Sequence, residues 1–145
     1  MTHWTDELHG ILLQITNEMN RPDVDARFLS RAGVNLDRAL YPLLSRIGAA
    51  GSIWTVELAA QAGRDHSTVS RQVAKLEQLS LIEREPSASD GRVRMLRPTP
   101  AGRRMIEKFA RTRRALMEAH FRDWSETEIK QLLRLLRKAA RKPEL

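Results

Sequence analysis

Apolar residues recur every three or four positions near the start of the chain, which is the spacing of one face of an amphipathic helix. This first pattern consists of Leu8, Ile11, Leu12, Ile15 and Met19, and it predicts a helix that ends at Arg21-Pro22-Asp23. A second helical pattern runs through Leu36, Leu40, Leu43, Leu44 and Ile47 and ends at the sequence GAAGS. Because proline lacks a backbone N–H, Pro42 predicts a kink or a restart inside the second pattern.

The segment from residue 54 to residue 79 predicts two helices joined by a tight turn. The sequence WTVELAAQAG indicates a short helix, with Thr55 as its N-cap and Gly63 in a left-handed conformation after its end. Asp65 can cap the next helix. At about 100° per residue, the core-facing stripe of that helix contains Val69, Val73, Leu76 and Ser80. Its opposite side carries Ser67, Arg71, Ala74 and Gln78, flanked by Thr68, Ser70 and Lys75.

After Leu79 the pattern changes to short extended segments. LIERE and RVRMLRP predict two strands, and the polar PSASDG between them predicts the turn of a β-hairpin. Thr99 followed by Pro100 indicates the start of a helix. A last helix begins at a capping box of Ser125 and Glu128, and its apolar face consists of Ile129, Leu132, Leu133 and Leu136.

This order of elements is typical of a winged helix-turn-helix. We therefore expect a mainly α fold with a small β-hairpin wing, in which a winged helix-turn-helix core is joined to a helical dimerisation region. The DNA-binding domain is expected at residues 31–104, with the helix-turn-helix at about 55–79 and the wing at about 81–98. Residues 1–30 and 105–145 are expected to form the dimerisation region, because a small winged domain cannot cover their apolar faces. An intrachain bundle of the same helices remains the alternative.

Composition narrows the class of protein. The 145 residues carry a formal charge of +7, which favours a polyanionic partner, although many basic proteins bind none. The chain has no cysteine, so disulfides and sensing by thiol oxidation are excluded. No apolar run approaches the roughly 20 residues that span a bilayer, and the polar start MTHWTDELHG is not a signal peptide. We expect a cytoplasmic protein with no membrane partner.

The helix after Asp65 carries candidate DNA-binding residues on its exposed side. Short hydroxyl side chains let its first turn approach phosphates and base edges, and Arg71 can reach the O6 and N7 atoms of guanine with a bidentate fork. The residues expected to contact double-stranded DNA are Ser67, Thr68, Ser70, Arg71 and Lys75. The alternative interpretation is that this helical face is only solvated.

The hairpin favours the DNA-binding interpretation. Residues 64–104 contain nine Arg and Lys against five Asp and Glu, a net charge of +4 in one small unit. A long polar hairpin tip contributes little to a core, so a groove or phosphate contact is its expected use. Asp90, Arg92 and Arg94 are the candidate residues of this wing, with Asp90 placed to steady the Arg92 guanidinium near a minor groove.

Residues 67–105, STVSRQVAKLEQLSLIEREPSASDGRVRMLRPTPAGRRM, resemble the MarR family of bacterial transcription regulators. The matching motifs are residues 68–71 of the recognition helix, Leu76-Glu77, the strand at residues 81–84, Asp90 with Arg92, and residues 97–103. Ser80 departs from the glycine that the family usually places before the strand. The resemblance covers the whole chain in layout and residues 54–104 in motif.

The resemblance implies an obligate homodimer that places two winged domains on successive major grooves of a palindromic operator. Most members are repressors, and a small-molecule inducer often tunes their affinity for DNA. The family's inducer pocket lies where the dimerisation helices meet the winged domain, so His9, Leu12, Tyr41 and Phe109 are candidate ligand-binding residues. The alternative is that each of these four residues belongs to the ordinary core or interface.

Other functions find less support in the sequence. The histidines at positions 3, 9, 66 and 120 show no spacing of a metal site, and no catalytic or phosphate-binding motif is present, so we expect no metal, no cofactor and no enzymatic activity. A nonspecific architectural or RNA-binding basic protein remains the main alternative, because the basic charge would permit it. A winged domain used only for protein contacts is a third hypothesis.

Overall fold

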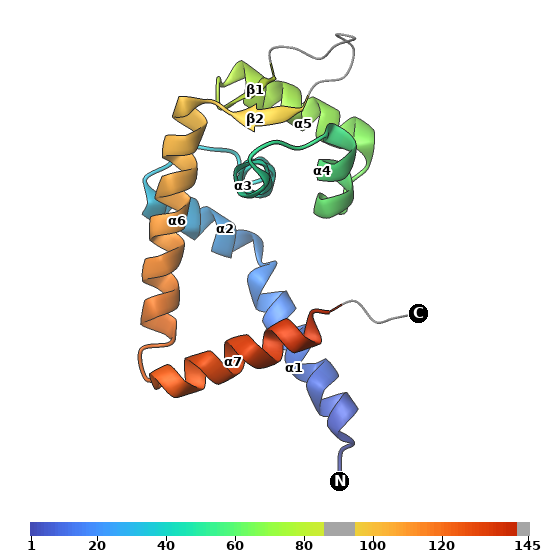
Figure 1. The fold of residues 1–145 in the computed structure, drawn as a ribbon, viewed down its shortest axis with the longest axis vertical. Coiled ribbons are helices and arrows are strands. Elements are labelled where there is room, and N and C mark those ends of the chain that lie inside the picture. The colour runs from blue at the N-terminus through green and yellow to red at the C-terminus, as the bar shows by residue number, and fades with distance from the viewer. Residues whose placement is uncertain (86–94, 142–145) are drawn as a thin grey trace. The chain divides into compact units, whose positions relative to one another are not determined.

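The computed structural model describes residues 1–85 and 95–141 (Figure 1). Its elements in chain order are α1 (Trp4–Met19), α2 (Pro22–Ala32), α3 (Tyr41–Ala50), α4 (Thr55–Ala62), α5 (His66–Gln78), β1 (Ile82–Arg84), β2 (Leu96–Pro98), α6 (Pro100–His120) and α7 (Glu126–Ala139). They form two compact units, Met1–Thr112 and Arg113–Leu145. The mainly helical fold with a two-stranded wing is therefore confirmed. The border expected between the DNA-binding domain and the dimerisation region, at residues 104 and 105, falls inside the continuous helix α6.

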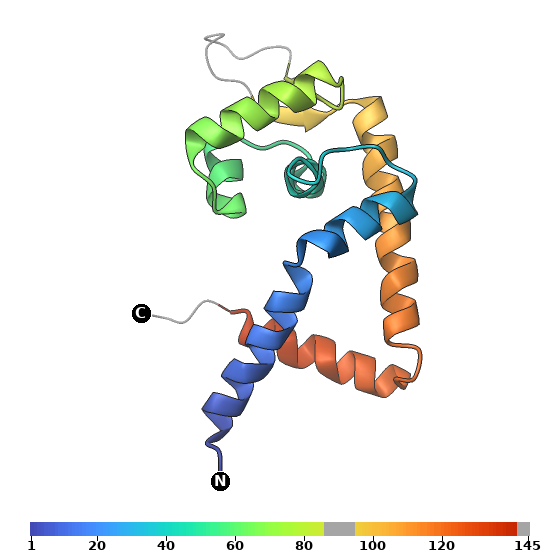
Figure 2. The same ribbon diagram turned by 180° about the vertical axis from the view of Figure 1, so that it is seen from behind.

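The core of the first unit forms around α3. Figure 1 and Figure 2 both show α3 end-on, with α2, α4, α5 and the hairpin arranged around it. Leu43, Leu44 and Ile47 of α3 are fully buried, as are Val69, Val73 and Leu76 of α5. Phe109 of α6 joins the same cluster. The winged unit therefore has its own hydrophobic core, which holds α5 in place from one side.

The hairpin is antiparallel and attached to the helix-turn-helix on a second edge. Ile82 pairs with Pro98, Glu83 with Arg97 and Arg84 with Leu96. On its other edge Leu96 exchanges two backbone hydrogen bonds with Ile53, of 3.0 and 2.8 Å, so the segment before α4 extends the small sheet. The two predicted strands are confirmed at Ile82–Arg84 and Leu96–Pro98, whereas the predicted turn and the first residues of the predicted second strand lie outside the described residues.

Two helix starts differ from the sequence-based expectation. The structure has a helix α2 at Pro22–Ala32, where the hydrophobic pattern predicted only a break. The helix expected from Leu36 begins at Tyr41, with Pro42 in its first turn, so of the kink and the restart predicted at this proline the structure shows a helix start. Both prolines occupy the first turn of a helix, where a missing backbone N–H costs nothing. Leu36 and Leu40 are nevertheless buried, from the segment that precedes α3.

Most predicted helix ends are confirmed. Gly63 has a φ of 64° after α4, and Ser125 and Glu128 form the capping box of α7. The Thr99 hydroxyl accepts a hydrogen bond from the Gly102 N–H at 3.0 Å. The expected N-cap of α4 is wrong by one residue, because Trp54 holds that position and Thr55 is already helical.

Ser80 does not lie on the buried stripe of α5, which corrects the prediction. It follows the end of α5, is exposed and has a φ of 58°. Its N–H donates to the Glu77 carbonyl at 2.9 Å, and the Leu81 N–H donates to the Leu76 carbonyl at 3.0 Å. These two bonds close the helix end in a Schellman motif, whose left-handed position normally favours glycine. The serine therefore stands where the family's usual glycine would be unstrained.

The second unit contains the end of α6 and the whole of α7. Met117, Phe121, Ile129, Leu132, Leu133 and Leu136 line an open apolar groove of about 420 Å³ between these helices. Every residue of α1, in the first unit, is also exposed. Within residues 1–85 and 95–141, no helix has the length and apolar composition needed to cross a membrane.

Candidate nucleic-acid interface

The exposed side of α5 matches the predicted recognition surface. Val69, Val73 and Leu76 face the core with no exposed area, as their spacing predicted. Ser67, Arg71, Ala74, Lys75 and Gln78 are exposed, whereas Thr68 and Ser70 are half-buried. All five candidate residues of this helix are therefore at least partly accessible, while the apolar stripe is buried.

The first turn of α5 contains a network that the sequence analysis did not predict. Asp65 occupies the N-cap position as expected, but its side chain makes no hydrogen bond of cap geometry with the helix backbone. Its Oδ2 atom instead accepts hydrogen bonds from the Ser67 hydroxyl at 2.9 Å and the Thr68 hydroxyl at 3.0 Å. An Nη2 group of Arg71 in turn donates to the Thr68 Oγ1 atom at 3.4 Å. The spacing of an aspartate two and three residues before hydroxyls is the sequence signal that could have revealed this network.

The charge of Asp65 is favoured by the same network. The hydroxyls of Thr68 and then Ser67 hold the pKa of the Asp65 carboxyl below its usual value, because they donate to its ionised form, and the backbone N–H of Thr68 adds a smaller effect in the same direction. Asp65 is exposed, so its negative charge lies at the surface at the start of α5.

Arg64 fixes α5 to the rest of the winged unit. Its Nη1 group donates to the Ala39 carbonyl at 2.8 Å and to the Gln72 Oε1 atom at 3.0 Å. Arg64 is half-buried, so this basic residue holds the segment before α3 against α5. No local sequence pattern could have predicted the contact, because Ala39 lies 25 residues away.

Arginines at the base of the wing are paired with acidic residues. Arg97 lies 3.0 Å from Glu83 across the two strands, and Arg84 lies 3.1 Å from Glu77 of α5. In the part of the chain that the structure describes, Arg71 and Lys75 have no such ion pair. The available cations of α5 are therefore Arg71 and Lys75. Asp90, Arg92 and Arg94 of the predicted wing lie outside the described residues.

The candidate ligand-binding residues fall into two separate groups. Tyr41 packs edge-on against Phe109, with ring centroids 4.9 Å apart, and Phe28 of α2 lies 5.0 Å from Tyr41. These rings form an aromatic cluster that connects α2, α3 and α6 inside the first unit. His9 and Leu12, by contrast, lie on the exposed surface of α1. Their joint role in a ligand pocket stays a prediction.

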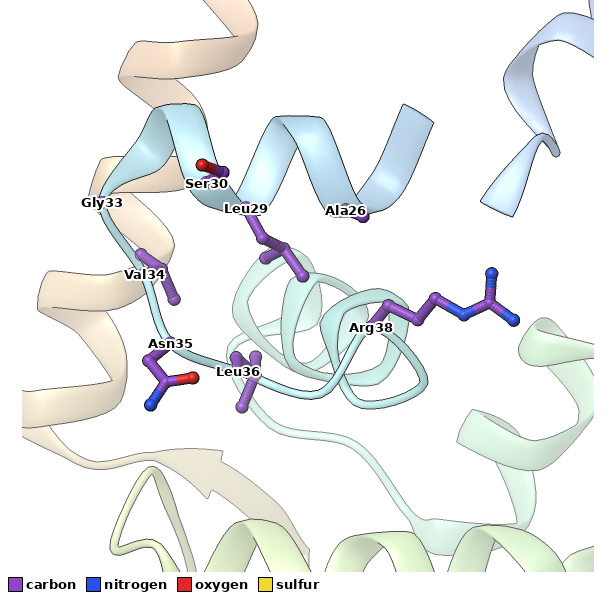
Figure 3. A pocket seen from close by; sticks show the side chains of 8 residues that line it. All are labelled: Ala26, Leu29, Ser30, Gly33, Val34, Asn35, Leu36 and Arg38. Atoms are coloured by element: carbon purple, nitrogen blue, oxygen red, sulfur yellow. The ribbon is translucent and has the colours of Figure 1, made fainter. Parts of the chain in front are cut away.

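A pocket of about 540 Å³ lies between α2 and the segment that leads to α3 (Figure 3). Figure 3 shows Leu29 pointing from α2 toward Leu36, while the guanidinium of Arg38 extends away from them. Val34 adds to the apolar lining, and Ser30 and Asn35 add polar groups. Leu29 is next to Phe28 in α2, so the wall of this pocket and the aromatic cluster share one helix. Among the described residues, no group of His, Asp and Glu is arranged to hold a metal ion.

The chain is similar to known transcription regulators over most of its length. The model of the MarR family matches residues 36–93. An uncharacterized HTH-type transcriptional regulator of Bacillus subtilis, YxaD, is 35% identical over 104 residues, which cover 72% of this chain and 73% of YxaD. The HTH-type transcriptional repressor IacR of Pseudomonas putida is 26% identical over 134 residues, covering 92% of this chain and 74% of IacR.

The fold is similar to a solved structure as well. A MarR family protein from Bacillus stearothermophilus superposes with a TM-score of 0.80 at 23% identity, covering 96% of this chain and 95% of that one. The family match includes α3, α4, α5 and β1, which are the elements that form and support the predicted recognition surface.

Proposed function

The chain belongs to the MarR family of HTH transcriptional regulators, and from this premise we propose that it is a repressor that binds a palindromic operator as a homodimer. It is a DNA-binding regulator of transcription and not an enzyme. The observation that carries the finer proposal is the exposed face of α5, where Arg71 and Lys75 stand beside small hydroxyl residues. Such a face suits base reading in a major groove together with phosphate contacts.

Repression is supported by similarity to IacR, which is named as a transcriptional repressor. A protein that binds across a promoter blocks transcription without needing a further activity. Its site of action is the cytoplasm, where bacterial DNA is accessible.

The homodimer is supported by apolar surface on both units. Leu8, Ile11, Leu12 and Ile15 of α1 are each about half exposed, at 47 to 51%. The second unit has its own open groove between α6 and α7. Burial of such surfaces against a second copy is favourable, because exposed apolar patches of this kind mark protein interfaces. A symmetric dimer would also present two recognition helices to a palindrome.

The test of DNA binding is selection of duplexes from a random library, followed by titration. The expected product is a palindrome of about 15 to 20 base pairs that binds at least about a thousandfold more tightly than random DNA of the same length. Equal affinity for all duplexes would support the nonspecific alternative, and preference for RNA would support an RNA-binding function. Absence of binding to any nucleic acid would leave the winged unit as a protein-contact domain.

Response to a small molecule is the remaining part of the proposal. The pocket beside α2 has an apolar floor of Leu29, Val34 and Leu36, which suits a small, largely apolar molecule. A ligand there would contact α2 next to Phe28, whose ring packs against Tyr41 of α3 and Phe109 of α6. The test measures melting temperature and operator release with a panel of small apolar molecules. Absence of a shift in both quantities across the panel would contradict a ligand in this pocket.

A further inference from the structure

The carboxylate of Asp65 lies at the start of the recognition helix, and its hydrogen bonds there come from two hydroxyls and not from a backbone N–H in cap geometry. An aspartate at an N-cap usually accepts a hydrogen bond from a backbone N–H of the first turn. Here the Oδ2 atom accepts from the hydroxyls of Ser67 and Thr68, both of which are candidate DNA contacts. The residue therefore acts on the DNA-binding side chains more directly than on the helix.

We propose that Asp65 is a specificity-determining residue, because it turns the Ser67 and Thr68 hydroxyls into hydrogen-bond acceptors that pair with exocyclic amino groups of adenine or cytosine. The same carboxylate disfavours DNA that offers no such donor. This inference rests on the proposed function, since it assigns a role within the DNA site of α5.

Each hydroxyl has a single hydrogen, and this limits Ser67 and Thr68 to DNA groups that donate hydrogen bonds. A hydroxyl has one hydrogen to donate and two lone pairs. While Ser67 and Thr68 donate to Asp65, their oxygens can only accept, and Thr68 already accepts a long bond from Arg71. Phosphate oxygens are also acceptors, so neither hydroxyl can bind a phosphate without leaving Asp65. In the major groove the donors are the N4 amino group of cytosine and the N6 amino group of adenine.

Charge strengthens the same preference. Asp65 is exposed and ionised, so its negative charge lies on the surface that approaches the DNA backbone. Repulsion from phosphates lowers affinity for every duplex, and only bases that donate to the acceptor cluster offset that cost. Asp65 thus reduces binding to random DNA more than binding to the operator.

The first experiment compares Asp65→Ser with the wild-type protein on the selected operator and on random DNA. Serine is also a favoured N-cap residue, so the melting temperature is expected to stay unchanged. Affinity for random DNA is expected to rise, because both hydroxyls become free to donate to phosphates. The ratio of operator affinity to random affinity is expected to fall about tenfold.

Glu107→Gln is the matched control, because it removes one negative charge at an exposed position of α6. It is expected to raise both affinities by the same factor and to leave their ratio unchanged. If Asp65→Ser also leaves the ratio unchanged, the inference is overturned and Asp65 is only one more surface charge.

The second experiment removes single amino groups from the operator, with purine in place of adenine and 2-pyrimidinone in place of cytosine. At one or more positions per half-site, the wild-type protein is expected to lose about tenfold in affinity, whereas the Asp65→Ser variant loses much less. Equal losses for both proteins, or none for the wild type, would overturn the inference. Failure of the proposed function is distinguishable, because the wild type would then select no operator at all.

Discussion

Arg71 is the single residue expected to contribute most to base recognition. It is exposed opposite Val69 and Val73 and has no ion pair among the described residues. Arg71→Ala is expected to cost about 1–3 kcal/mol on the operator and far less on random DNA, as loss of a bidentate base contact does. Lys75→Ala should weaken both by a similar amount, as loss of a phosphate contact does. Titration of both duplexes decides the matter, and an unchanged ratio for Arg71→Ala would refute its base-reading role.

Ser80 shows how backbone geometry constrains a residue outside the DNA-binding surface. Its φ of 58° is unfavourable for a residue with a Cβ atom. Ser80→Gly is therefore expected to raise the free energy of unfolding by about 0.5–1 kcal/mol. Urea unfolding at fixed protein concentration measures the change. Ser80→Ala keeps the strain and should give no gain, so equal stability of the glycine and alanine variants would contradict this explanation.

Gly102 is required for a different reason, because the backbone of Leu81 leaves no room for a side chain at this position. A Cβ atom at this position would lie 1.9 Å from the Leu81 carbonyl oxygen, so α6 and the residue before β1 would have to separate. Gly102→Ala is expected to lower the free energy of unfolding by at least about 2 kcal/mol, as overpacking against backbone does. Arg104→Ala is the control, an exposed change in the same helix that should stay within about 0.5 kcal/mol of the wild type. Similar stability of the two variants would mean that the approach is not this close.

At the scale of elements, hydrophobic spacing predicted the helices with strong apolar stripes. The stripe of α5 is unambiguous, because Val69, Val73 and Leu76 are all fully buried and no proline interrupts it. Among the residues of α2 whose burial is described, only Leu29 is buried, and the first residue of the helix is the proline that suggested a break. Leu36 and Leu40 are buried without being helical, which extended the predicted α3 too far. Hydrophobic periodicity thus predicts which residues are buried. It predicts where a helix begins only if a proline is also considered as a residue of the first turn.

The sequence predicted which face of α5 is exposed, but it did not predict the hydrogen bonds among the residues of the candidate DNA-binding site. The exposed face of α5 follows from the 3.6-residue period, which placed Ser67 and Arg71 correctly. The contacts of Arg64 with Ala39 and Gln72 depend on tertiary packing and could not be predicted. Asp65 was correctly predicted at the N-cap position, but its hydrogen-bond partners were not predicted. The hydroxyls of Ser67 and Thr68 compete with the backbone N–H groups of the first turn for its carboxylate.

The contribution of the hairpin to DNA binding is expected to come from the residues between its two strands. β1 and β2 form a paired base through Glu83 and Arg97, and Arg92 lies between the strands in sequence. Arg92→Ala is expected to lower operator affinity by at least about tenfold, near 1.4 kcal/mol, without changing the melting temperature much. Asp90→Ala should give a smaller loss in the same direction.

Operators with A·T-rich or G·C-rich flanks test how Arg92 acts. A narrow A·T-rich minor groove attracts arginine through its negative potential, so the loss should be larger on that flank. Equal losses on both flanks would make Arg92 a phosphate contact. No loss on either would exclude the wing from the DNA-binding surface.

At the scale of the whole molecule, helices α1 and α7 expose large apolar side chains that no other part of the single chain covers in the described residues. α1 exposes Trp4, Leu8, Ile11, Leu12, Leu13, Ile15 and Met19, and α7 exposes Leu133, Leu135 and Leu136. Soluble monomers rarely expose contiguous apolar patches of this extent. Under the proposed homodimer each unit would supply a surface for the second copy, and the spacing of the two recognition helices would depend on that interface.

Sedimentation at micromolar concentration is expected to show about twice the chain mass of 16.6 kDa. Leu12→Glu places a charge on the apolar face of α1, where Leu12 is 51% exposed in the single chain, and should shift the protein to the monomer mass. Operator affinity should fall in parallel, because a monomer engages one half-site, while the helical content measured by circular dichroism stays constant. Val56→Glu, at a residue of α4 that is 67% exposed, is the control and should remain dimeric. A wild-type monomer with intact helical content, or a dimeric Leu12→Glu variant, would show that α1 does not form the interface.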